Sequence, residues 1–133
     1  MIVADTNLIA YLLIRGEHTG AAERVLAKDP VWAAPVLWRS ELRNVLALYL
    51  REGHLKLSAA LQYMEEAEGL LAAHEYRVPS APVLELVQQS ACSAYDCEFV
   101  HLARELGVPL VTSDRKVLRA FRDIAVSPQA FAG

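Results

Sequence analysis

Short apolar runs alternate with longer amphipathic stretches along the whole chain of 133 residues. The short runs predict buried strands, and the stretches between them have the spacing of apolar residues that is typical of helices. Strands are predicted near Ile2–Asp5, Val31–Ala34, Glu75–Val78, Pro109–Thr112 and Ile124–Val126, and helices near Asn7–Ile14, Thr19–Lys28, Leu37–Glu52, Ser58–Ala73, Ala81–Ser90, Tyr95–Leu106 and Lys116–Phe121. This order favours an α/β fold with a mostly parallel sheet covered on both faces. Because no repeat, linker or low-complexity stretch interrupts the pattern, we expect one domain, residues 1–133.

The composition favours a soluble protein that works in the cytoplasm. Hydrophobic residues make up 54% of the chain, which allows a sizeable core and some apolar surface for a partner. No apolar run is long enough to cross a bilayer, and the first residues, MIVADTN, do not resemble a signal peptide. The two cysteines, Cys92 and Cys97, are expected to be reduced thiols. The net charge of −3 argues against a generally basic nucleic-acid binder, although the distribution of charge matters more than its total.

Four acidic residues occupy positions where a carboxylate is costly to place. Asp5 and Asp114 each follow a short apolar run at the carboxyl end of a predicted strand. Glu41 borders the apolar stripe of one predicted helix, and Asp96 lies on the inward side of another at its first turn. In open parallel sheets, ligand sites form at the carboxyl ends of the strands, particularly where the strand order reverses. The four carboxylates could therefore converge at one edge of the sheet.

Each of these acids, taken singly, has an ordinary structural explanation. Asp5, Asp96 and Asp114 can cap helices, and Glu41 can reach solvent from a half-exposed helix face. Carboxylates gathered near a core repel one another and lose hydration, so as a set they require protonation or a cation. Capping leaves Glu41 unexplained, whereas Mg²⁺ or Mn²⁺ would explain all four because these ions favour carboxylate oxygen. The sequence therefore predicts a site for a hard divalent cation.

Other chemistries lack their characteristic residues. There is no glycine-rich phosphate loop, no G-x-S-x-G elbow and no H-E-x-x-H helix. Zinc is disfavoured because the histidines are scattered, and each is expected to be structural: His18, His54, His74 and His101. The segment Asp5-Thr6-Asn7 after a strand faintly suggests an aspartyl phosphotransferase. Such enzymes also require a lysine near the site, and Lys116 is the only candidate near a strand end.

In these motifs the chain resembles the PIN domain, a family of metal-dependent nucleases. The matching segments are IVADTN at Ile2–Asn7, WRSELRNVL at Trp38–Leu46, SAYDCEFVHLA at Ser93–Ala103, VTSDR at Val111–Arg115 and VSPQAF at Val126–Phe131. The resemblance covers essentially the whole chain. Within the family, the sequence is most similar to the VapC-like toxin nucleases of toxin–antitoxin pairs.

The resemblance implies a three-layer α/β/α sandwich with a five-stranded parallel sheet in the order 3-2-1-4-5. It also implies that the acidic quartet is both catalytic and metal-binding, and that three polar residues support it. The quartet is Asp5, Glu41, Asp96 and Asp114, and the supporting residues are Asn7, Thr112 and Ser113. The expected activity is Mg²⁺- or Mn²⁺-dependent cleavage of RNA, with 5′-phosphate and 3′-hydroxyl products. The expected partners are an RNA substrate, a second copy of the chain and a small antitoxin.

Several parts of the sequence leave alternatives open. Four cations near the acids could bind substrate phosphates or simply face solvent: Arg39, Arg43, Arg115 and Lys116. The apolar stripe of the Leu57–Ala73 segment is expected to pack in the core by default, with a partner-binding face as the alternative. The chain could also be a housekeeping RNA-processing nuclease, or a non-catalytic binding module whose acids are structural caps.

Overall fold

The strands of this protein are short and apolar, and they form the central layer of the molecule. The computed structural model describes all 133 residues. The strands are β1 (Ile2–Ala4), β2 (Trp32–Pro35), β3 (Glu75–Tyr76), β4 (Leu110–Val111) and β5 (Ala125–Val126). The helices are α1 (Thr6–Leu13), α2 (Thr19–Lys28), α3 (Trp38–Arg51), α4 (Leu57–Leu70), α5 (Ser80–Gln88), α6 (Ala94–Leu106), α7 (Arg115–Ala120) and α8 (Pro128–Ala132). Every predicted strand and helix is present, with boundaries that differ by a few residues.

The five strands form one sheet in the order β3-β2-β1-β4-β5, and every neighbouring pair is parallel. This confirms the predicted topology. The strand order reverses beside β1, whose partners are β2 on one side and β4 on the other. All three residues of β1 are fully buried, as expected of a central strand covered on both faces.

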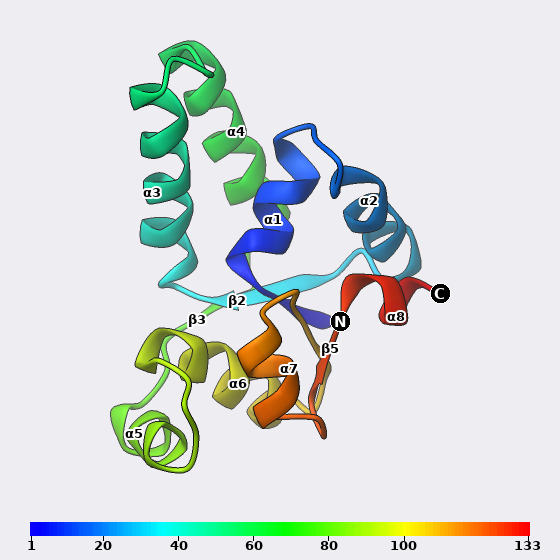
Figure 1. Cartoon of the computed structure of the whole chain (residues 1–133), viewed down its shortest axis with the longest axis vertical. Coiled ribbons are helices and arrows are strands. Elements are labelled where there is room, and N and C mark those ends of the chain that lie inside the picture. The colour runs from blue at the N-terminus through cyan, green and yellow to red at the C-terminus, as the bar shows by residue number, and fades with distance from the viewer.

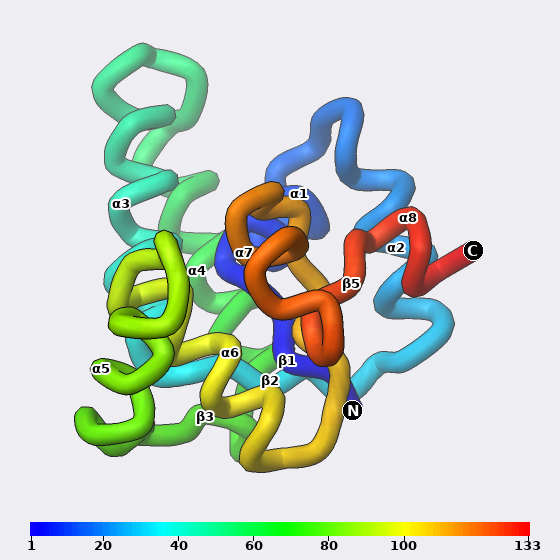
Figure 2. Tube along the Cα trace, turned by 60° about the horizontal axis from the view of Figure 1, so that its bottom comes forward, coloured from blue at the N-terminus to red at the C-terminus, as the bar shows by residue number.

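Helices cover both faces of the sheet and make three layers (Figure 1). Helices α1 to α4 lie on one side of the sheet, and α5, α6 and α7 lie on the other. Helix α6 crosses β1 and β2 in the view that brings this second side forward (Figure 2). The arrangement confirms the predicted α/β/α sandwich. No helix is both long enough and apolar enough to span a bilayer.

Helices α3 and α4 form an antiparallel pair that extends beyond the sheet (Figure 1). The sequence predicts that α3 buries an apolar stripe made of Trp38, Leu42, Val45, Leu46 and Tyr49. Trp38, Leu42 and Leu46 are buried, Val45 is half-buried, and Tyr49 is 36% exposed. The default prediction that the α4 stripe packs in the core is wrong for Leu57 and Leu61, which are 63% and 61% exposed. The physical reason is that the outer part of the pair has no sheet beneath it. The buried residues of this segment are two small ones, Ala60 and Ala67, and Leu71, which directly follows α4.

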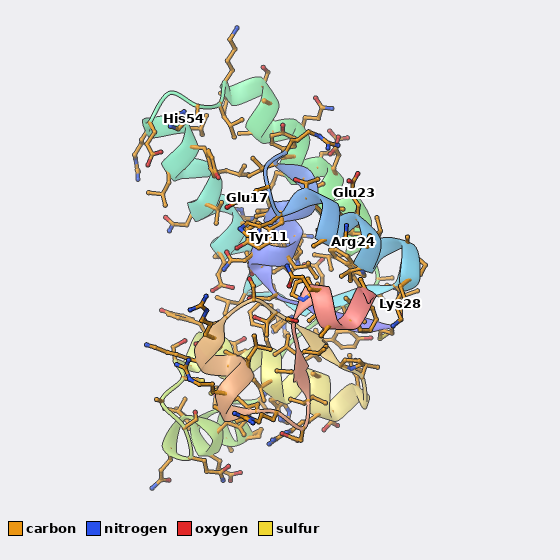
Figure 3. All side chains as sticks on the ribbon, turned by 45° about the vertical axis from the view of Figure 1, so that its right-hand side comes forward. Tyr11, Glu17, Glu23, Arg24, Lys28 and His54 are labelled. Atoms are coloured by element: carbon orange, nitrogen blue, oxygen red, sulfur yellow. The ribbon has the colours of Figure 1, made fainter.

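The sequence-based prediction ended before the last helix, α8. A Ser127 hydroxyl accepts a hydrogen bond from the Ala130 N–H, and Pro128 occupies the first turn, so the local sequence begins a short helix. Lys28 of α2 holds this helix in place (Figure 3). Its Nζ donates to the Phe131 carbonyl oxygen at 2.5 Å and lies 4.6 Å from the centre of the Phe131 ring.

The two cysteines form no disulfide, as predicted, and two of the scattered histidines lie among helices α1 to α4. Cys92 and Cys97 are free and buried, and burial raises the pKa of both thiols. His54 lies at the outer end of the α3–α4 pair, far from the strand ends (Figure 3). Tyr11 and His18 have ring centres 4.5 Å apart on the α1–α2 side.

Candidate active site

All four predicted acids line one cavity at the carboxyl end of the sheet. The cavity has a volume of about 230 Å³ and is lined by Asp5, Thr6, Asn7, Glu41, Asn44, Val45, Asp96 and Asp114. Asp5 follows β1 and Asp114 follows β4, so these two come from the strands between which the order reverses. Glu41 comes from the first turn of α3 and Asp96 from the first turn of α6. The topology therefore brings together acids that are far apart in the sequence.

Asp5 precedes α1 in the N-cap position, but its side chain makes no capping hydrogen bond. Instead, the Thr112 hydroxyl donates to Asp5 Oδ2 at 2.8 Å. Burial raises the Asp5 pKa to about 6, and the nearby charges of Glu41 and Asp96 add to this effect against the opposing hydrogen bonds from Thr112 and Thr6. The helix-capping explanation of Asp5 is therefore not supported, and its carboxylate is costly to ionise in the absence of a cation.

Glu41 is also held by a threonine hydroxyl. Thr6 Oγ1 donates to Glu41 Oε1 at 2.7 Å, and Thr6 itself is only 4% exposed. Burial raises the Glu41 pKa, and the charges of Asp96 and Glu98 raise it further, whereas the Thr6 hydrogen bond lowers it. Asp5 and Glu41 are thus two carboxylates whose charged forms are disfavoured by the same surroundings.

Asp96 and Asp114 do cap helices, as the alternative explanation predicted. Asp96 Oδ2 accepts from the Ser93 N–H at 3.3 Å, and Ser93 Oγ accepts from the Asp96 N–H at 3.1 Å, which is a complete capping box. Asp114 Oδ1 accepts from the N–H groups of Lys116 and Val117 at 2.8 and 3.2 Å. Capping therefore accounts for these two acids but not for Asp5 or Glu41.

Capping and ligand binding do not exclude each other in this cavity. The hydrogen bonds described above use one oxygen of each carboxylate: Oδ2 of Asp5, Oε1 of Glu41, Oδ2 of Asp96 and Oδ1 of Asp114. The second oxygen of each remains for a ligand. The side chains are not arranged as a preformed set of three or more metal ligands. The donor set nevertheless fits a hard divalent cation, because it offers carboxylate oxygens and no nitrogen or sulfur.

Two of the predicted phosphate-binding cations lie beside the acids. Arg115 and Lys116, together with Arg119, line a second cavity of about 530 Å³. Asp96 and Asp114 also line this cavity, so it adjoins the acidic one. The cations come from α7, which Asp114 caps.

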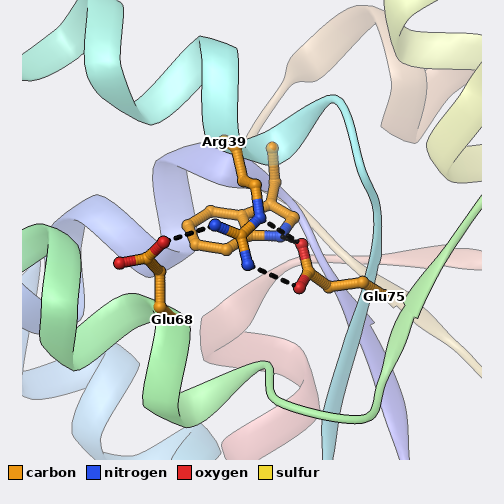
Figure 4. A network of polar contacts seen from close by, with 4 residues as sticks. Arg39, Glu68 and Glu75 are labelled. Carbon is orange, nitrogen blue, oxygen red and sulfur yellow. Dashed lines mark hydrogen bonds and ion pairs between the residues drawn. The ribbon is translucent and has the colours of Figure 1, made fainter.

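The other two predicted cations are placed differently. Arg39 lies between Glu75 of β3 and Glu68 of α4 (Figure 4). Its Nε and one terminal nitrogen donate to the two Glu75 oxygens at 2.7 and 2.8 Å, and the other terminal nitrogen donates to Glu68. All three guanidinium nitrogens are therefore engaged, which argues against the predicted role of Arg39 in phosphate binding. Arg43 is exposed and makes no ion pair.

The supporting residues differ in what they contact. Thr112 is 1% exposed, and its hydroxyl donates to Asp5 while accepting from the Asp114 N–H at 3.1 Å. Asn7 lines the acidic cavity. Ser113 is exposed and makes no side-chain hydrogen bond. The sequence-based reasoning missed Thr6 and Asn44, although Asn44 follows Glu41 by three residues on the same helix face.

Comparisons with known proteins agree with this fold. The PIN domain model matches residues 2–125. The chain is 28% identical over 123 residues to Ribonuclease VapC3 of Pyrobaculum aerophilum, and the alignment covers 90% of this chain and 94% of that protein. The crystal structure of PAE2754 from the same organism matches with a TM-score of 0.74 at 19% identity, covering 98% of this chain and 92% of that chain. Because the family model matches nearly the whole chain, this protein belongs to the PIN domain family.

Proposed function

We propose that this protein is a metal-dependent endoribonuclease of the VapC type, with residues 1–133 acting as one nuclease domain. The observation that carries the proposal is the cavity lined by Asp5, Glu41, Asp96 and Asp114 at the point where the strand order reverses. The raised pKa values of Asp5 and Glu41 support it, because both carboxylates lack a cationic partner. The similarity to a protein named Ribonuclease VapC3 supports RNA as the substrate.

In this proposal the four carboxylates would hold one or two Mg²⁺ or Mn²⁺ ions, and Glu41 would bind a second ion or orient the attacking water. Such an ion, when bound, would lower the pKa of water and offset the charge that develops on the phosphate. Thr112 and Thr6 hold the Asp5 and Glu41 carboxylates through their hydroxyl groups. Asn7 and Ser113 complete the polar surroundings. The products carry 5′-phosphate and 3′-hydroxyl ends.

Cations on the α7 side bind the phosphates of the RNA that flank the cut. Arg115, Lys116 and Arg119 line the cavity next to Asp96 and Asp114, and phosphate contacts of this kind position a nucleic acid without reading its sequence. Arg43 is exposed on α3 and is available to a more distant phosphate. We leave Arg39 out of this set because its guanidinium is paired within the fold.

We also propose that the protein acts in the cytoplasm as the toxin of a toxin–antitoxin pair, forms a homodimer and binds a small antitoxin protein. The exposed apolar side chains of the α3–α4 pair support a protein partner: Leu48, Leu57 and Leu61 are each more than half exposed. A housekeeping role in RNA processing is the competing proposal. Expression in cells discriminates them, since a toxin arrests growth and the product of a neighbouring gene relieves the arrest.

The activity itself is tested by incubating the purified chain with single-stranded RNA and Mn²⁺. We expect cleavage that EDTA abolishes, and Asp5→Asn should lower the rate at least ~100-fold while keeping the fold, because the amide retains an acceptor for Thr112. Glu65→Gln is the matched control, because it makes the same chemical change at an exposed position on α4. Full activity of Asp5→Asn, or cleavage that persists in EDTA, would overturn the metal mechanism.

A further inference from the structure

The two sides of the acidic cavity have different chemistry. On the α7 side, the adjoining 530 Å³ cavity carries three cations. On the other side, a groove of about 300 Å³ is lined by Leu37, Ser40, Glu41, Asn44 and Tyr95, and none of these is a cation. This groove shares Glu41 and Asn44 with the acidic cavity. The two neighbouring cavities therefore differ: three cations line the one on the α7 side, whereas the other has an aromatic side chain, polar side chains and Glu41, with no cation.

Tyr95 forms the aromatic wall of this groove. It lies in the first turn of α6, directly before Asp96, and it is 61% exposed. Its ring has no aromatic partner, and its hydroxyl makes no hydrogen bond within the chain. The face of an exposed tyrosine ring is an apolar surface on which a planar ligand can stack. The ring face of Tyr95 is thus available next to a candidate cation ligand.

The opposite wall of the groove is one face of the first turns of α3. Leu37, Ser40, Glu41 and Asn44 have the spacing i, i+3, i+4 and i+7, which places them along one side of a helix. Ser40 and Asn44 are exposed, and neither side chain is engaged in a hydrogen bond within the chain. The Asn44 amide offers both donors and an acceptor, and the Ser40 hydroxyl can do either. The wall can therefore recognise a planar group that carries both donors and acceptors at its edge.

We propose that this groove binds a nucleobase of single-stranded RNA, stacked on the Tyr95 ring and hydrogen-bonded at its edge by Asn44 and Ser40. This inference rests on the proposed function, and it adds a base-binding subsite beside the cleavage site. Bases stack on aromatic side chains in many single-strand binders, because every base has a π-face. The absence of a cation from the groove disfavours a phosphate as the occupant. The nucleotide on this side of the cut is thus held by its base, and the RNA on the α7 side by its phosphates.

The test measures binding in the Asp5→Asn background, so that the RNA stays intact. Fluorescein-labelled oligouridine is compared with an oligomer of the same length that has the ribose–phosphate backbone but no bases. We expect Tyr95→Ala to weaken oligouridine binding by about tenfold and to leave the affinity for the abasic oligomer unchanged. Tyr95→Phe should restore the preference for oligouridine, because the ring remains. Leu84→Ala is the matched control, since Leu84 is also 61% exposed but lies on α5, and it should change neither affinity.

Three binding results would overturn the inference. The parent protein could bind the abasic oligomer as tightly as oligouridine, or Tyr95→Ala could weaken both equally, or Tyr95→Ala could leave both unchanged. A change in sedimentation caused by Tyr95→Ala would also overturn it, by assigning the groove to a protein interface. The proposed function is judged separately, by Mn²⁺-dependent cleavage with the wild-type chain. If the wild type cuts RNA but Tyr95→Ala does not selectively weaken oligouridine binding, the base-binding subsite is rejected and the proposed function stands.

Discussion

Two groups of carboxylates lie near the start of helix α3, and they differ in whether a cation of the chain is paired with them. Arg39 lies between Glu68 and Glu75, which accept hydrogen bonds from all three of its guanidinium nitrogens (Figure 4). Glu41, only two residues later, faces other acids and no cation. The Arg39 hydrogen bonds hold the pKa of Glu75 below its usual range, whereas burial raises the pKa of Glu41.

The difference separates acids that are paired with a cation of the chain from acids that have no cationic partner in the chain. Glu75 joins the edge strand β3 to the start of α3, because it also accepts from the Trp38 indole N–H at 2.8 Å. Its charge is compensated within the chain. The charge at Asp5 is not compensated, and the cost of ionising it is a free energy that a bound cation could recover.

The largest effect on stability is expected at Asp5. The native state binds a proton at Asp5 more tightly than the unfolded chain does, since the pKa is about 6 rather than 3.8. Stability therefore falls as the pH rises from about 4 to about 6 and stays lower above that. In EDTA at pH 7, Asp5→Asn should raise the free energy of unfolding by up to about 3 kcal/mol. Urea unfolding across this pH range measures the difference, which should vanish towards pH 4.

In EDTA at pH 7 the Asp5→Asn variant should be more stable than the wild type, and adding Mn²⁺ should reverse this order of stability. The wild type gains a ligand that binds only the folded state, so its melting temperature rises, whereas Asp5→Asn should gain much less. Glu65→Gln serves again as the control and should follow the wild type under both conditions. If Asp5→Asn is less stable than the wild type in EDTA at pH 7, the carboxylate is compensated after all and the contrast with Glu75 fails.

A smaller change, and in this case a loss of stability, is expected when Arg39 is removed from between Glu68 and Glu75. Arg39→Met keeps much of the aliphatic stem but leaves Glu68 and Glu75 without their cation. Because the pair sites are 20% to 41% exposed, solvent screens part of the cost, and we expect a loss of about 2 kcal/mol in urea unfolding. Arg43→Met makes the same change at an exposed, unpaired position of α3 and should cost less than about 0.5 kcal/mol. Cleavage at 25 °C should be little changed in Arg39→Met, and a collapse of activity in that variant would show that Arg39 and its two glutamates also position Glu41.

The sequence predicted the sheet well because its strands are central and apolar. Residues such as Ile2–Ala4 and Leu110–Val111 are buried on both faces, so the apolar runs identify them directly. The α3–α4 pair was harder to predict. Periodicity identifies an apolar stripe, but it does not tell whether the sheet extends far enough to cover it, and Leu57 and Leu61 are exposed for that reason.

The acids of the site could be selected from the sequence because each was costly at its position. The hydroxyls that hold them were harder to find. Thr112 was included only through the family resemblance, and Thr6 was missed, because its contact with Glu41 spans 35 residues and no local pattern reports it. The pairing of Arg39 was missed for the same reason, since Glu68 and Glu75 come from other elements. Long-range polar contacts of this kind depend on the tertiary fold.

The smallest expected effect concerns Thr6. The hydroxyl favours the charged form of Glu41, so Thr6→Val should raise the Glu41 pKa further and leave more of it protonated at acidic pH. We expect cleavage to fall by up to about fivefold at the acidic end of the pH profile, corresponding to roughly 1 kcal/mol for the lost hydrogen bond, and the loss should shrink as the pH rises. Thr19→Val is the control, because Thr19 is equally buried and hydrogen-bonds to the Tyr11 carbonyl away from the cavity. It should lower stability without moving the pH profile. An identical pH profile for Thr6→Val and the wild type would mean that the Glu41 charge is set by burial and neighbouring acids alone.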